Sequence, residues 1–264
     1  MQSVTIMGSG AAPGVPSVAC GWGKCNPDNP KNKRQRAGTY FEFGDTKILV
    51  DTSPDLRSHL LQYNIKKLDA VLLTHAHADH LHGIDDLREI NRITKLPIDF
   101  YSAGQAYDDA TTRFSYLFSN AGKEVKDTRL PMLIPHKAEF NQPFMVKDVK
   151  IMPIKLEGHN SPSNGYVFND GQVVMLSDFE SIDTKTVEKL CGKIKLLIIP
   201  LTTPHKVRFH ADFNMIMEDI KAFAPQKAVL THMAAECDYD EINKMTPDNV
   251  IVGYDGLKID LEEM

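Results

Sequence analysis

The sequence predicts an α+β fold built from two related β/α halves in one domain, residues 1–264. Strand-like apolar segments precede helix-like segments in both halves, and no low-complexity linker separates them. Two short stretches also repeat, since residues 70–75 read AVLLTH and residues 228–232 read AVLTH. A second pair, VDT at 50–52 and LSD at 176–178, places an aspartate near a strand end in each half. These repeats indicate that strands in the two halves present polar side chains at matching ends.

The first half opens with an expected strand, residues 3–7, which ends where glycine and proline become frequent. A long loop follows and reaches past Cys20 and Cys25 to a basic stretch, residues 31–36. Loops of this length are usually functional or disordered. Apolar periodicity then predicts a hairpin of strands 40–43 and 48–51, a helix at 54–63, a strand at 70–73, a helix at 87–93, a strand at 98–101 and a helix at 105–118.

The second half begins with consecutive strands separated by turn residues. We expect these strands at 144–156, 165–168 and 173–176. The chain then alternates again, with a helix at 184–190, a strand at 196–199, a helix at 213–223, a strand at 228–231 and a last hairpin near 250–259.

Composition excludes several classes of protein. With 42% hydrophobic and 25% charged residues, the chain is neither disordered, collagen-like nor a small disulfide scaffold. Its net charge of −5 argues against general nucleic-acid binding. The apolar runs are too short to span a membrane and the first residues lack a basic signal-peptide start, so no membrane association is expected. Together with four scattered cysteines, this favours a cytoplasmic protein.

The strongest chemical signal is the segment from His75 to His80, which reads HAHADH. In extended backbone, His75 and His77 point to the same side and can reach one metal ion, while Asp79 and His80 follow where the chain turns and can reach a second. Further candidate ligands lie downstream at strand ends: His159, Asp178 and His232. The sequence therefore predicts a site for two metal ions.

This order of ligands resembles the metallo-β-lactamase superfamily along nearly the whole chain. The resemblance implies a four-layer αββα sandwich with two mixed β-sheets, in agreement with the two halves described above. It also implies that one ion is held by His75, His77 and His159, that the other is held by Asp79, His80 and His232, and that Asp178 bridges them. A bridging aspartate is similar to the phosphodiesterase and glyoxalase branches, because many true β-lactamases of the superfamily have cysteine there.

Other segments resemble the phosphoribosyl cyclic phosphodiesterases of phosphonate breakdown: Gly8-x-Gly10, GVP at 14–16, the cysteine-bearing loop, HADFN at 210–214 and YDG at 254–256. The resemblance places His210 at the phosphate end of the site. That subfamily also holds a structural zinc with three loop cysteines and a histidine. Cys20 and Cys25 match this pattern and Cys237 can supply a third thiolate, but Trp22 and Ala235 occupy the other two ligand positions.

Imidazole and carboxylate ligands suit Zn²⁺ and also accept Mn²⁺ or Fe²⁺, so the expected cofactors are two divalent transition-metal ions. Two such ions activate water and polarise a phosphoryl group. The catalytic candidates are Asp79 and His210. His210 is expected to donate a proton to the departing alkoxide, with His205 as the reserve, and His210 and Asp212 are the candidate substrate-binding residues, with Asp212 orienting His210.

The predicted function is a dinuclear metal-dependent phosphodiesterase that hydrolyses a small phosphodiester, such as a cyclic ribose phosphate or a nucleotide-like compound. The expected partner is this anionic substrate. The basic stretch 31–36 either lines the entrance for it or forms a solvated charged loop, and a homodimer stays open. Three other functions stay open: tRNA 3′ processing, thioester hydrolysis of the glyoxalase II kind, and a non-catalytic PqqB-like accessory role.

Overall fold

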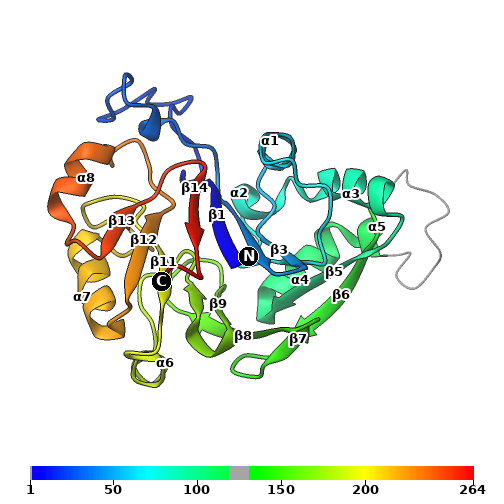
Figure 1. The fold of residues 1–264 in the computed structure, drawn as a ribbon. Coiled ribbons are helices and arrows are strands. Elements are labelled where there is room, and N and C mark those ends of the chain that lie inside the picture. Colours follow the sequence, from blue (N-terminus) through cyan, green and yellow to red (C-terminus); the bar gives the residue numbers. More distant parts are fainter. Residues whose placement is uncertain (1, 119–130) are drawn as a thin grey trace.

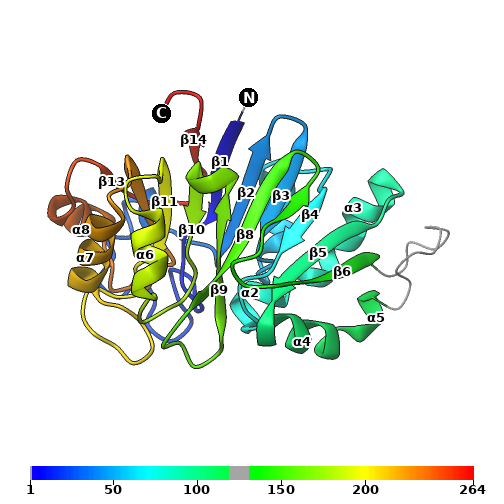
Figure 2. The ribbon, with the colours of Figure 1, turned by 90° about the horizontal axis from the view of Figure 1, so that it is seen from below.

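The computed structural model describes residues 2–118 and 131–264. Within these ranges two seven-stranded sheets face each other, and helices cover both outer faces (Figure 1). Figure 2 shows the four layers, with α3, α4 and α5 outside one sheet and α6, α7 and α8 outside the other. The predicted αββα sandwich with two mixed sheets is confirmed. In the same described ranges no helix is long and apolar enough to cross a membrane.

The first sheet has the strand order β14-β1-β2-β3-β4-β5-β6. Strands β3 to β6 run parallel, whereas β14, β1, β2 and β3 pair antiparallel. Its strands are β1 (Gln2–Gly8), β2 (Gly38–Phe43), β3 (Thr46–Val50), β4 (Ala70–Leu72), β5 (Ile98–Ala103), β6 (Leu133–Ala138) and β14 (Leu257–Asp260). The helices of this half are η1 (Pro30–Asn32), α1 (Leu56–Gln62), α2 (Ala78–Leu81), η2 (Ile84–Asp86), α3 (Leu87–Thr94), α4 (Gly104–Arg113) and α5 (Ser115–Phe118).

The second sheet has the order β13-β12-β11-β10-β9-β8-β7. Strands β10 to β13 run parallel, so each sheet contains four parallel strands, in agreement with two related halves. Its strands are β7 (Phe144–Val146), β8 (Val149–Leu156), β9 (Ser163–Phe168), β10 (Val173–Met175), β11 (Leu196–Pro200), β12 (Lys227–Thr231) and β13 (Val250–Val252). The helices are η3 (Asn169–Gly171), α6 (Thr184–Leu190), α7 (Phe213–Phe223) and α8 (Tyr239–Met245).

Three apolar cores hold the layers together, and the strand period of two sorts side chains between them. On β11, Leu196 and Ile198 enter the core between the sheets, whereas Leu197 and Ile199 enter the core under α6 and α7. On β4, Leu72 packs between the sheets and Val71 faces the helices of the first half. Because both faces of these strands are buried, the strands read as continuous apolar runs.

Three sequence predictions about the elements are wrong. The last hairpin, 250–259, does not form, because β13 pairs with β12 in the second sheet and β14 pairs with β1 in the first. The helix expected at 105–118 is interrupted at Phe114, whose φ of −114° and ψ of 34° are not helical. The region 144–156 contains two strands, separated by a turn in which Lys147 has a φ of +52°.

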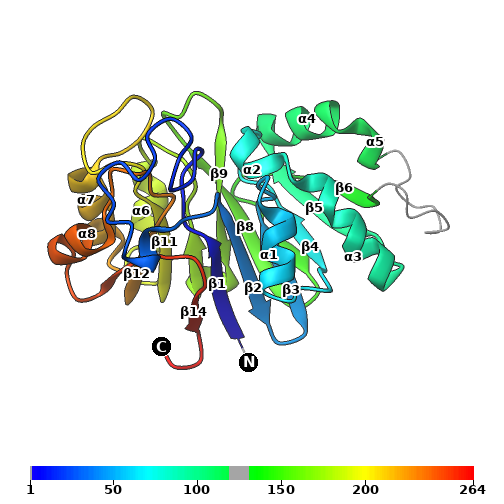
Figure 3. The ribbon, with the colours of Figure 1, turned by 90° about the horizontal axis from the view of Figure 1, so that it is seen from above.

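The parallel strands of both sheets carry the candidate site at their carboxyl ends. Asp51 follows β3, the histidine-rich segment follows β4, Asp178 follows β10 and His232 follows β12. Figure 3 shows α2, which contains two of the candidate ligands, at the upper end of the first sheet in this view. The sandwich therefore brings together side chains that lie up to 181 residues apart in sequence (51 to 232).

Candidate metal centre

The histidine-rich segment is held in place by Asp51, a buried residue that sequence reasoning noted only as part of a repeat. The Asp51 carboxylate accepts hydrogen bonds from the Thr74 backbone N–H (2.8 Å) and hydroxyl (2.9 Å). Its Oδ2 also lies 2.6 Å from His80 Nδ1. These contacts join the beginning and the end of the segment to β3, so that its side chains face the second sheet.

The first group of candidate ligands consists of His75, His77, His159 and Asp178, whose nearest donor atoms lie within 4.8 Å of one another. His77 Nδ1 is 3.1 Å from both His75 Nε2 and His159 Nε2. His159 enters the group because Gly158 allows a φ of +84°, and a Cβ there would lie 2.4 Å from the Cβ of Glu180. The loop after β8 can therefore turn inward only with glycine at this position.

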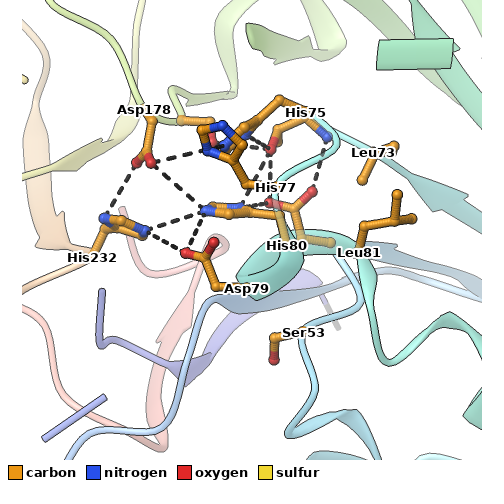
Figure 4. Close-up of polar contacts among 12 residues, drawn as sticks. Ser53, Leu73, His75, His77, Asp79, His80, Leu81, Asp178 and His232 are labelled. Atoms are coloured by element: carbon orange, nitrogen blue, oxygen red, sulfur yellow. Dashed lines mark hydrogen bonds and ion pairs between the residues drawn. The ribbon is translucent and has the colours of Figure 1, made fainter. Parts of the chain in front are cut away.

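The second group consists of Asp79, His80 and His232. The Nε2 atoms of His80 and His232 are 3.2 Å apart, and Asp79 Oδ2 lies 3.2 and 3.3 Å from them. Asp178 stands between the two groups, as Figure 4 shows. Its Oδ2 is 3.8 Å from Nε2 of both His75 and His80, and its Oδ1 is 3.2 Å from His232 Nδ1 in a geometry that makes no hydrogen bond.

These distances fit metal ligands. Two nitrogens bound at about 2.0 to 2.1 Å in a tetrahedral arrangement lie about 3.3 to 3.4 Å apart, close to the 3.1 and 3.2 Å found here. Ligating histidines usually engage their second ring nitrogen with a polar group outside the metal. The Nδ1 atoms of His75, His80 and His159 do so with Thr74 Oγ1, Asp51 Oδ2 and the Phe209 carbonyl. The buried, unbonded Asp178 Oδ1 is a further sign that a cation belongs between the groups.

Electrostatics favour the metal-binding protonation state at His75, Asp79 and Asp178. At His80 the carboxylates of Asp51 and Asp79 outweigh burial and raise the pKa, so this ring must lose a proton when a cation binds. Burial alone would raise the pKa of Asp79 and Asp178, but the surrounding histidines outweigh it and hold both pKa values well below the ordinary value. Burial, together with the neighbouring His80, lowers the pKa of His75 well below its usual range. The two carboxyl groups are therefore ionised and His75 is neutral at physiological pH, which are the protonation states that metal binding requires.

His210 lies beside this centre on a strained turn. Its ring centroid is 5.1 Å from that of His159 and 6.4 Å from that of His232. The preceding residue, Phe209, has a φ of +70°, which is unusual for a bulky side chain and is found where structure elsewhere fixes the backbone. Its carbonyl accepts a hydrogen bond from His159 Nδ1 (3.2 Å). One turn thus orients a candidate ligand and places the candidate proton donor.

The expected orienting role of Asp212 is not what the structure shows. Asp212 Oδ1 accepts the backbone N–H of Met215 (3.0 Å) and caps α7. The His210 ring instead approaches Thr202, whose Oγ1 is 3.2 Å from His210 Nδ1. His205 lies on the surface and pairs with Glu236 (3.0 Å). Thr202 was not predicted, and its only sequence signal is its position just after a strand of the second sheet.

The three candidate cysteines of the doubtful structural zinc site do not come together as a group of metal ligands in the described residues. Cys20 is exposed, whereas Cys25 and Cys237 are buried, and among the described residues no group of three possible ligands includes a cysteine. Burial raises the pKa of Cys25 and raises that of Cys237 to about 12, so both remain thiols. Trp22, Val15, Cys25 and Ala235 pack together instead. Apolar contact therefore holds this part of the loop, and Trp22 and Ala235 occupy the two positions at which the resembling subfamily has zinc ligands.

We expect a Cys20→Ser, Cys25→Ser double variant to keep its catalytic metals and its turnover, because neither sulfur lies in the two ligand groups. The thermal unfolding midpoint of the variant should fall only modestly, because the buried Cys25 side chain is replaced. This fall should be the same with and without a chelator that removes only weakly held ions. A loss of one zinc ion per chain with collapse of thermal stability would restore the zinc hypothesis.

Comparisons with known proteins agree with this geometry. Residues 46–233 match the model of the beta-lactamase superfamily domain. The structure of a new diphosphatase from the PhnP family is similar with a TM-score of 0.87 at 25% identity, over 98% of each chain. An octanoyltransferase of Porphyromonas gingivalis is 29% identical over 98% of this chain and 51% of that protein, and a ribonuclease Z of Methanopyrus kandleri is 29% identical over 50% of each. The chain spans about half the length of these curated relatives.

Proposed function

Because the chain belongs to the beta-lactamase superfamily, whose members are mostly metal-dependent hydrolases, we propose that it is a dinuclear metal-dependent phosphodiesterase. The observation that carries the proposal is the pair of ligand groups with Asp178 between them. His75, His77 and His159 would hold one ion, Asp79, His80 and His232 would hold the other, and Asp178 would serve both. The histidine and carboxylate ligands suit Zn²⁺ best and accept Mn²⁺ or Fe²⁺.

When bound, two such ions supply water activation and charge neutralisation at a phosphoryl group. The residues of the chain supply the proton transfers. Asp79 is a ligand of the second group and is ionised, and its carboxylate oxygen not engaged by the ion would accept the proton of the attacking water. As the bond between phosphorus and the leaving oxygen breaks, His210 donates a proton to that oxygen. Asp79 belongs to the first half and His210 to the second. One residue can therefore accept the proton of the water while the other donates a proton to the leaving group.

The substrate class in this proposal is a small phosphodiester, such as a cyclic ribose phosphate or a nucleotide-like compound. The similarity to a diphosphatase supports chemistry at phosphorus. The relative described as an octanoyltransferase supports a second candidate, thioester hydrolysis, although this chain matches only 51% of that protein. The similarity to a ribonuclease Z supports a third candidate activity, RNA processing, which the substrate panel also tests.

Elemental analysis combined with a substrate panel tests the proposal. We expect about two tightly bound transition-metal ions per chain, because the ligands form two groups that share Asp178. The panel contains a cyclic ribose phosphate, 2′,3′-cyclic nucleotides, bis-p-nitrophenyl phosphate, S-lactoylglutathione, an octanoyl thioester and a precursor tRNA. Turnover of the phosphodiesters supports the proposal. At most one ion under metal-replete conditions would remove the dinuclear mechanism, and turnover of the thioesters alone would replace the substrate class.

A further inference from the structure

A single hydroxyl group, that of Thr202, lies between two imidazoles of the candidate site. Thr202 Oγ1 is 3.2 Å from His210 Nδ1 and 3.3 Å from His232 Nδ1. His232 Nδ1 also has the Asp178 carboxylate at 3.2 Å. His210 Nδ1 has no carboxylate partner among the contacts of the described residues, so Thr202 is the polar group that its ring meets on this side.

The backbone of Thr202 is fixed by the second sheet. Strand β11 pairs in register with β12, with Pro200 opposite Thr231. Just beyond it, the Leu201 N–H donates to the Thr231 carbonyl (2.8 Å) and the Ala234 N–H donates to the Thr202 carbonyl (3.0 Å). These bonds leave the residue little freedom to shift relative to His232. The hydroxyl is therefore a fixed point beside the His210 ring.

We propose that Thr202 is the positioning residue for His210: its hydroxyl accepts a hydrogen bond from His210 Nδ1–H and so turns Nε2 toward the substrate. The inference rests on the proposed function, in which His210 donates a proton to the leaving oxygen. A neutral imidazole carries one proton, and its location depends on the bond that the other nitrogen makes. With that proton on Nδ1 and held by Thr202, the ring takes up a second proton from solvent at Nε2 and becomes imidazolium. It gives the Nε2 proton to the leaving oxygen and so returns to the neutral Nδ1–H form.

The neighbouring residues cannot take this role in the observed arrangement. The Asp212 carboxylate caps α7. The Thr203 hydroxyl donates to the His205 carbonyl (2.7 Å), and His205 itself pairs with Glu236. Thr203 thus offers a matched control, since it is the same residue type one position away and bonds a different group.

The first test compares the variants Thr202→Val, Thr202→Ser and Thr203→Val. Because Thr202 also contacts His232, elemental analysis must first confirm that each variant binds two ions. Thr202→Val should lower kcat on a cyclic ribose phosphate or an alkyl phosphodiester by about 10- to 100-fold, with KM little changed. Turnover of bis-p-nitrophenyl phosphate should be nearly unaffected, because p-nitrophenolate needs no proton. Thr202→Ser, which retains the hydroxyl, should recover most of the loss, and Thr203→Val should behave as the unmodified protein.

The second test reads the imidazole directly. Long-range ¹H–¹⁵N spectra of the zinc-loaded protein should show neutral His210 protonated on Nδ1, and Thr202→Val should shift it toward the Nε2–H form or a mixture. An unchanged tautomer, or equal kcat losses on both kinds of phosphodiester, would overturn the role of Thr202.

A double variant separates this inference from the proposed function. In a His210→Ala background, Thr202→Val should cause no further leaving-group-dependent loss, because Thr202 acts through His210. If His210→Ala shows the leaving-group effect and Thr202→Val does not, the positioning role fails and the proposed function stands. If His210→Ala itself shows no such effect, the proton-donor role in the proposed function fails.

Discussion

Replacing Asp178 with alanine is expected to produce the largest loss of activity of any single change in the chain. Asp178 is buried between the two ligand groups and has an oxygen within 3.9 Å of nitrogens of both. Without this shared carboxylate, nothing holds the two ions at a fixed separation and the positive charge of the pair is less well balanced. We expect kcat to fall by about 10³-fold or more and the metal content to fall from about two ions to one or fewer.

Elemental analysis and steady-state kinetics on the same preparation check this expectation. The matched control is Asp212→Ala, which removes a carboxylate close to His210 in sequence but disturbs only the cap of α7. That variant should lose about 1 kcal/mol of stability and keep both metals. Full activity of Asp178→Ala with two ions bound would show that Asp178 is not the shared ligand.

The parts of the fold that the sequence predicts well are those with a local cause. Residues 184–190 and 213–223 are predicted as helices, and α6 and α7 occupy the same residues, each beginning after an aspartate that caps it. The hairpin at 250–259 was wrong because strand partners are chosen by distant packing. Gly253 donates to the Leu230 carbonyl of the second sheet, whereas Gly256 donates to Ile6 of the first. No local sequence pattern predicts that the chain passes from the second sheet to the first between β13 and β14.

The residues of the candidate site likewise fall into those that a local sequence pattern reveals and those that depend on distant packing. The segment from His75 to His80 could be identified from sequence because two histidines, an aspartate and a further histidine within six positions have no packing explanation. The positions of Asp51 and Thr202 follow from which strands lie side by side, so sequence reasoning did not assign them roles. The doubtful zinc site also depends on packing. Cys25 matches the subfamily's metal pattern and Cys237 could add a third thiolate, but both are buried as thiols among apolar side chains.

His210→Ala should lower kcat by about 10²- to 10⁴-fold on a cyclic ribose phosphate or an alkyl phosphodiester, the usual range for loss of general acid catalysis. An alkoxide is a poor leaving group and needs a proton as its bond to phosphorus breaks. The loss on bis-p-nitrophenyl phosphate should be far smaller, because p-nitrophenolate is stable without a proton. Both metal ions should remain bound, since His210 belongs to neither ligand group.

The comparison of leaving groups distinguishes proton donation from binding. A residue that only anchors phosphate would raise KM on both substrates without regard to the leaving group. His205→Ala is the companion variant. Because His205 is exposed and paired with Glu236, its removal should change kcat on either substrate by less than about twofold. Equal kcat losses on the two substrates in His210→Ala would leave His210 as a phosphate anchor, and a leaving-group-dependent loss in His205→Ala would transfer the acid role to that residue.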